Sequence, residues 1–221
     1  MKTTDHRTNR PRISVIAVAA ALLLAASAAA ETVRYEAQPT GSKMAMEGTS
    51  TIHDWTVRSP TINGFIEADA NFPESALNDP TAAKPVVQVF IPVDTLKSYA
   101  EAMDSVMQDH LNMEQYPRIE YRLTELKPRS AAGAAGPLKF DAVGTLTVSG
   151  TTQTIIMPVT IERLDRTKLK VVGSMPLKMT DFDVTPPAPR ILGMPTIKTG
   201  DDIKISFEWL VEQKAGPTKT R

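Results

Sequence analysis

The stretch LKFDAVGTLTVSGTTQTIIMPVTIE, residues 138–162, decides the fold class. Its apolar residues occupy alternate positions on both sides of a central Ser149-Gly150 pair, and only Val143 and Ile156 break the alternation. Successive side chains of a strand point to opposite faces of a sheet, so the pattern predicts two antiparallel strands that each bury one face. Gly150 tolerates a positive φ, which favours a short hairpin between them.

The same alternation continues on both sides of this hairpin. It is clear in residues 168–178 and 202–212, and weaker in 44–52, 62–68, 87–91 and 119–123. About eight strands with one apolar face need that face covered, either by closure into a barrel or by packing of two sheets. The interior of an eight-stranded barrel has room for side chains or for one small ligand. We predict an all-β fold, an eight-stranded antiparallel barrel.

One segment follows a helical period instead. After Asp94, a candidate N-cap, apolar residues recur every three or four positions up to Leu111. This spacing predicts one amphipathic helix between the third and fourth predicted strands, ended by Pro117. Residues 70–85 and 128–137 are expected to be surface loops. The proline-rich segment 185–200 is long enough for a lid or a rim contact, although most such loops are connectors.

The first thirty residues predict export. Four basic residues precede an apolar run of about 14 residues, and small residues up to Ala30 form an A-x-A-like cleavage site before Glu31. A membrane span needs ~20 apolar residues, so a signal peptide over residues 1–30 is favoured over an uncleaved tether. We therefore expect a periplasmic protein without an integral span after cleavage, with one barrel domain over residues 31–221.

The composition excludes several classes of site and partner. The chain has no cysteine, which removes disulfides, thiolate zinc sites, cysteine nucleophiles and lipoprotein acylation. Residues 31–221 carry 21 basic and 24 acidic side chains without a basic stripe, so neither nucleic acid nor an anionic lipid surface is an expected partner. Their two histidines, His53 and His110, lack metal-ligand spacing, and a glycine-rich phosphate loop is missing. We predict no metal and no cofactor.

The segment from Ser50 to Asp54 contains the residue types of a hydrolytic triad, with His53 between them. Neighbours on one strand face opposite ways and cannot meet as nucleophile and base, and the chain has no G-x-S-x-G elbow. We expect His53 and Asp54 to form local hydrogen bonds at a strand end, and Trp55 to cap the barrel. The prediction is a protein that is not an enzyme. Scattered carboxylates leave a hydrolase or an isomerase as an alternative.

Several motifs together resemble the YceI-like family. They are STIHDW at 50–55, INGFIEAD at 62–69, FIPVDTLKS at 90–98, MDSVMQDHLNMEQYPRIEYRL at 103–123, the hairpin VGTLTVSGTTQTIIMPVTIE at 143–162 and DDIKISFEWLVE at 201–212, within a resemblance that covers about 44–212. The resemblance implies a lipocalin-like barrel whose pore holds a long polyisoprenoid chain, such as an isoprenoid quinone or a polyprenyl phosphate. It also implies a periplasmic protein, commonly a homodimer and not an enzyme. The residues expected near the channel are Ile52, Trp55, Phe65, Phe90, Leu96, Met103, Met107, Leu111, Val148 and Met157.

Methionine and glycine are frequent among the inward positions of the predicted strands. Methionine is flexible and adapts to variable partners, which favours a ligand channel. The predicted function is therefore periplasmic binding of an isoprenoid lipid in the barrel, as a carrier or a sequestering protein. The alternative is a structural or interaction module whose barrel is filled by its own side chains.

Overall fold

The computed structural model describes residues 32–80, 83–188 and 196–214. Its strands are β1 Thr32–Ala37, β2 Lys43–Ser50, β3 Trp55–Ser59, β4 Asn63–Asp69, β5 Val86–Pro92, β6 Arg118–Pro128, β7 Leu138–Val148, β8 Thr151–Arg163, β9 Lys168–Lys178 and β10 Thr199–Gln213. The helices are α1 Glu74–Asn78 and α2 Glu101–His110, with short 3-10 turns η2 Val93–Thr95 and η3 Thr180–Phe182.

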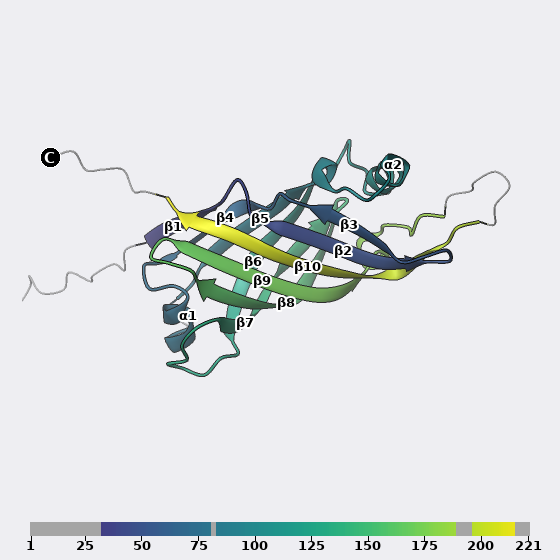
Figure 1. Ribbon diagram of the computed structural model, residues 1–221. Coiled ribbons are helices and arrows are strands. Elements are labelled where there is room, and N and C mark those ends of the chain that lie inside the picture. The colour runs from purple at the N-terminus through teal and green to yellow at the C-terminus, as the bar shows by residue number, and fades with distance from the viewer. Residues whose placement is uncertain (1–31, 81–82, 189–195, 215–221) are drawn as a thin grey trace, which may run out of the picture. The chain divides into compact units, whose positions relative to one another are not determined.

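Eight strands close into an antiparallel barrel in the order β1-β4-β5-β6-β7-β8-β9-β10, and β10 pairs back with β1 (Figure 1). The long strand β10 has two partners on one edge, β1 near its end and β2 over most of its length. The hairpin of β2 and β3 thus extends the sheet beyond the closed ring. The predicted barrel is confirmed, but β1 and β3 were not predicted as strands.

The alternation in the sequence matches the burial of side chains. In β7 and β8, the inward residues of the predicted hairpin are buried from Leu138 to Leu146 and from Ile155 to Ile161, and Val148 beside the turn is partly buried. The two exceptions, Val143 and Ile156, are cross-strand partners, so they lie beside each other on the outer face. Ser149 and Gly150 both adopt positive φ and form the turn of the predicted hairpin.

The helix prediction is right in its place between β5 and β6 and wrong at both ends. Asp94 belongs to η2, and the chain then extends so that Lys97 pairs with Arg58 of β3 through two backbone hydrogen bonds of 2.8 Å. The helix begins only at Glu101. It ends at His110 because Asn112 turns the chain with a φ of 50°, well before Pro117.

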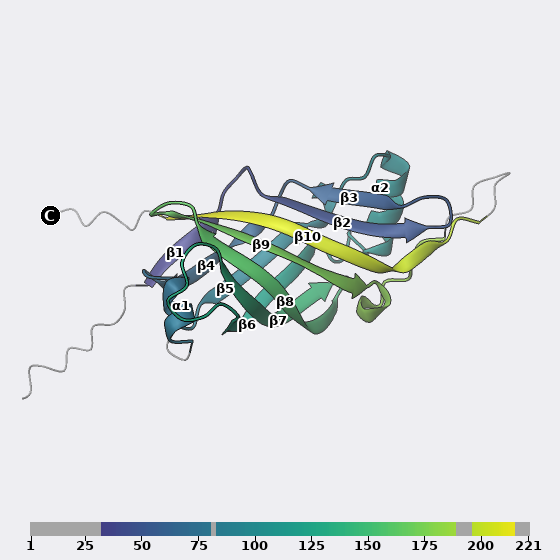
Figure 2. The same cartoon turned by 60° about the horizontal axis from the view of Figure 1, so that its bottom comes forward.

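The two helices lie at opposite ends of the barrel (Figures 1 and 2). At the α1 end, within the predicted loop 70–85, Phe72, Ala76 and Leu77 are buried. The guanidinium of Arg163 holds this segment by donating to the Phe72 carbonyl and, at 3.1 Å, to Glu74. This end is filled by protein, so any ligand space lies toward α2.

Candidate functional site: a cavity between the barrel and helix α2

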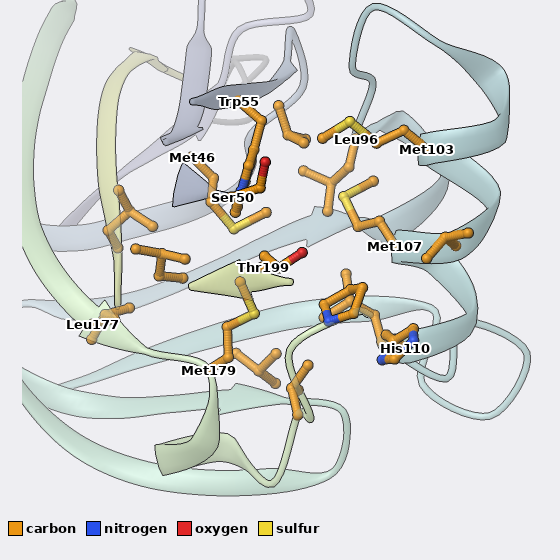
Figure 3. A pocket seen from close by; sticks show the side chains of 18 of the residues that line it. Met46, Ser50, Trp55, Leu96, Met103, Met107, His110, Leu177, Met179 and Thr199 are labelled. Carbon is orange, nitrogen blue, oxygen red and sulfur yellow. The ribbon is translucent and has the colours of Figure 1, made fainter. Parts of the chain in front are cut away.

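A cavity of about 470 Å³ lies at the α2 end of the barrel (Figure 3). One wall is α2, and the others come from β2, β3, β9, β10 and the ends of β6 and β7. Figure 3 shows Met103, Met107 and His110 on α2, facing Met46 and Trp55 across the space. The volume is in the range typical of small-molecule sites.

The cavity lining is almost entirely apolar. No Asp, Glu, Lys or Arg among the described residues lines it, and the polar side chains there are a few hydroxyl, phenol, imidazole and indole groups. The lining residues are Met44, Met46, Ser50, Ile52, His53, Trp55, Val57, Leu96, Tyr99, Ala100, Ala102, Met103, Val106, Met107, His110, Leu111, Ile119, Leu146, Val148, Leu177, Met179, Phe182, Val184, Pro187, Ile197, Thr199, Ile203, Ile205 and Phe207.

The rim of the cavity carries a hydrogen bond between two loops. The Nε2 atom of His53 lies 3.0 Å from the hydroxyl of Tyr99, and its Nδ1 atom lies 2.7 Å from the carbonyl oxygen of Asp54. A carbonyl oxygen only accepts, so Nδ1 carries a hydrogen and, in neutral His53, Tyr99 donates to Nε2. Tyr99 and Ile52 are 73% and 52% exposed, which places this rim at the solvent boundary.

The opposite rim uses the second histidine. Nδ1 of His110 donates to the carbonyl oxygen of Thr185 at 2.8 Å, which ties the end of α2 to the segment after η3. In the segment 185–200, Pro187 and Ile197 line the cavity, so its described ends form a rim contact. Thr199 and Gly200 belong to β10, and residues 189–195 of the predicted loop lie outside the described residues.

Asp104 fastens the first turn of α2. It is buried, and its Oδ1 accepts the backbone N–H of Ser98 at 2.6 Å, while Nζ of Lys97 lies 4.0 Å from Oδ2. Burial alone would raise the pKa of Asp104, but the hydrogen bonds from Ser98 and the charge of Lys97 outweigh it and leave that pKa below its usual value. The helix wall is therefore held by a carboxylate outside the cavity lining.

The segment from Ser50 to Asp54 does not form a triad. The hydroxyl of Ser50 donates to the His53 carbonyl at 2.7 Å and accepts from the backbone N–H groups of Ile52 and His53. Both ring nitrogens of His53 are engaged with Asp54 and Tyr99, as above. These contacts are the local strand-end hydrogen bonds predicted from the sequence. Trp55, whose Nε1 donates to the Thr49 carbonyl at 3.0 Å, lies across Gly48 of β2 and lines the cavity.

The structure brings seven of the ten predicted channel residues to this cavity: Ile52, Trp55, Leu96, Met103, Met107, Leu111 and Val148. The placement of Phe65 and Phe90 was wrong, because their neighbours Ile66 and Val89 take the inward positions. Phe65 and Phe90 lie on the outer face, where the Cζ atoms of Arg34 and Arg118 stand 3.6 and 5.1 Å from their ring centroids.

Met157 points inward but into a second, smaller cavity of about 90 Å³. It is lined by Ile62, Val89, Tyr121, Ala142, Met157, Val159, Phe207 and Trp209. The hydroxyl of Tyr121 donates to the Ala142 carbonyl at 3.2 Å, and burial raises the pKa of this phenol, so it stays neutral. The resemblance implied one long pore, whereas the structure has a large cavity beside α2 and a smaller one deeper in the barrel, with Phe207 lining both.

Sequence reasoning missed part of the lining. Leu177, Ile203 and Ile205 lie on the inward face of predicted strands, so alternation could have found them. Phe182 and Val184 lie in and after η3, where the sequence gives no period, and only the fold brings them to the cavity.

The described part of the chain has neither a metal-ion site nor a helix that could span a membrane. No three His, Asp or Glu side chains lie close enough there to hold a metal ion. Within those same residues, no helix combines the length and the apolar character that a membrane crossing requires.

Comparison with known families matches residues 35–210 to the YceI-like domain. The chain belongs to the YceI-like family. No curated protein matches it. Solved structures share the fold: a polyisoprenoid binding domain from Saccharophagus degradans, implicated in plant cell wall breakdown, aligns with a TM-score of 0.60 at 16% identity, covering 81% of this chain and 98% of that one.

Two further solved structures are similar. BcnA of Burkholderia cenocepacia has a TM-score of 0.56 and 18% identity, over 76% of this YceI-like chain and 95% of its own. The YCEI protein of Campylobacter jejuni has a TM-score of 0.51 and 18% identity, over 72% and 85%. At these identities the likeness establishes the fold of the barrel.

Proposed function

We propose that this protein binds an isoprenoid lipid in the 470 Å³ cavity and acts as a periplasmic carrier or sequestering protein without catalytic activity. The observation that carries the proposal is the uncharged, apolar lining between the barrel and α2. Membership of the YceI-like family and the polyisoprenoid binding domain of Saccharophagus degradans support the ligand class. Apolar burial at ~25 cal/mol per Å² supplies affinity for a tail that fills the space.

The rim chemistry favours an uncharged head group, such as a quinone, over a polyprenyl phosphate. Tyr99, Ser50 and Thr199 provide hydroxyl groups and His53 and His110 provide imidazoles, but no described lining residue is Lys or Arg. A phosphate is bound most strongly by charge-assisted hydrogen bonds from such cations. Carbonyl and hydroxyl head groups need only neutral partners.

Export and dimer formation belong to the same proposal as predictions. Export rests on the signal-peptide pattern of residues 1–30. Pairing into homodimers rests on the family resemblance alone.

A matched pair of tryptophan substitutions tests the cavity as a binding site. Val148→Trp adds a ring to the large cavity, so the protein should fold with its stability nearly unchanged and lose geranylgeraniol binding at least tenfold. Met157→Trp adds the same ring beside the 90 Å³ cavity, where overpacking should cost ~1–3 kcal/mol while binding in the large cavity persists. Denaturant melts and equilibrium binding check both. Full binding by a folded Val148→Trp protein would contradict the proposal.

A further inference from the structure

The large cavity and the small cavity share one wall. Among the described residues, Phe207 of β10 alone lines both of them. Beyond the small cavity the interior is filled, because Trp209, Phe140 and Tyr35 are each 2% exposed or less. A chain entering from the α2 end therefore meets Phe207 before it can reach the remaining free space.

The ring of Phe207 has its inward position because β9 carries a glycine beside it. Phe207 pairs with Gly173, and a Cβ atom built on Gly173 would lie 2.6 Å from Cε1 and Cζ of the phenyl ring. Any other residue at 173 would compete with the ring for this space. The pair of Gly173 and Phe207 thus places an aromatic ring over the neighbouring strand, between the two cavities.

The volume of the large cavity, in front of the Phe207 ring, limits the length of the chain that the cavity can hold. A dry apolar cavity of about 150 Å³ holds one benzene molecule. The 470 Å³ cavity therefore holds about three such rings, or roughly 18 carbon atoms, which corresponds to between three and four isoprene units. Removing the Phe207 ring would join the 90 Å³ space to it and add the volume of the ring itself.

We propose that Phe207 is a partition that limits the bound tail to about four isoprene units, so that this protein selects short prenyl chains. The inference deepens the proposed function and rests on it. The short tail proposed here differs from the long chain that the family resemblance implied. A tail longer than the cavity would leave its extra isoprene units in water.

The experiment offers lipid-free protein an equimolar mixture of farnesol, geranylgeraniol, geranylfarnesol and hexaprenol in detergent micelles. Native mass spectrometry reports the share of each prenol bound. For the wild type, the bound ratio of hexaprenol to geranylgeraniol should be about one or lower. In Phe207→Ala the ratio should rise at least about tenfold, because each newly buried methylene alone changes affinity roughly fourfold.

Met157→Ala is the matched control, since it enlarges the small cavity and leaves the partition in place. Its ratio should stay at the wild-type value. Phe207→Leu, which shortens the partition without removing the side chain, provides the comparison if Phe207→Ala fails to fold. A wild type that already prefers hexaprenol tenfold, or Phe207 variants that match Met157→Ala, would overturn the inference while leaving isoprenoid binding intact. Absence of every prenol from the wild type would remove the proposed function and the inference together.

Discussion

His53 and Tyr99 connect the loop between β2 and β3 to the segment before α2. Their 3.0 Å hydrogen bond crosses the cavity rim, and their rings meet edge to face with centroids 5.8 Å apart. Each residue lies far from the other in sequence, so the contact restrains the loop between β2 and β3 against the segment before α2, in addition to the backbone pairing of Lys97 with Arg58. At the scale of single residues, this pair links one rim of the cavity to the segment that leads into α2, as His110 links α2 to the opposite rim.

A double-mutant cycle measures this link. His53→Ala and Tyr99→Phe should each lower the free energy of unfolding by about 0.5–1.5 kcal/mol, because each removes one side of the hydrogen bond. The double variant should lose little more than either single variant, since the shared interaction is lost only once. Denaturant unfolding provides the four values. Additive losses would show that the two residues act independently.

Rim and channel residues could be predicted from the sequence only where they belong to an alternating segment or to a recognised motif. Trp55 belongs to the STIHDW motif and Val148 lies at the end of an alternating segment, and both line the cavity. Phe65 and Phe90 were misplaced because their placement followed the family resemblance and not the alternation of β4 and β5. The stacking of Arg34 on Phe65 depends on tertiary contacts between strands, which a single segment does not encode.

At the scale of elements, α2 depends on one buried carboxylate. Asp104 accepts the Ser98 N–H and joins the first turn to the extended segment that pairs with β3. Asp104→Ala should lower the free energy of unfolding by about 1–2 kcal/mol and increase hydrogen exchange in α2, because it leaves the Ser98 N–H without its partner. Asp104→Asn keeps an acceptor oxygen and should lose less.

The pH dependence of α2 follows from the lowered pKa of Asp104. A carboxyl group with a lowered pKa in the folded state stabilises that state above its ordinary pKa, and the stabilisation is lost as the pH falls through the lowered value. Protection of the α2 amides from hydrogen exchange should therefore decrease in strong acid in the wild type. The same step should be missing from Asp104→Asn. Identical exchange in wild type and Asp104→Ala at neutral pH would contradict the anchoring role.

The helix boundaries show why an element can be predicted in place but not in length. Leu96 fits the helical period, yet it lies in an extended segment and is buried there. The next residue, Lys97, pairs with β3. A pairing with a distant strand leaves no trace in local spacing. The strands β7 and β8 were predicted correctly because their alternation is long and their turn carries its own signal in Gly150.

At the scale of the whole molecule, the closed sheet creates an interior and the side chains divide it. About eight alternating strands were enough to predict closure, because an apolar face of that width has few ways to be covered. The division of the interior into two cavities could not be predicted from the sequence, because the inward residues of a strand alternate in the same way whether they fill the core or line a cavity. The α1 end is packed solid, Phe207 marks the partition, and free volume remains beside α2.

The central claim is that the cavity beside α2 holds an apolar isoprenoid chain. It is tested most directly by native mass spectrometry of the full-length gene product purified from the periplasm of a bacterial host. The spectrum should show a polypeptide that begins at Glu31, carrying an adduct whose released mass is that of an isoprenoid, and Val148→Trp prepared in parallel should lack the adduct. A wild type that is isolated without lipid and takes up no prenol or quinone would contradict the account.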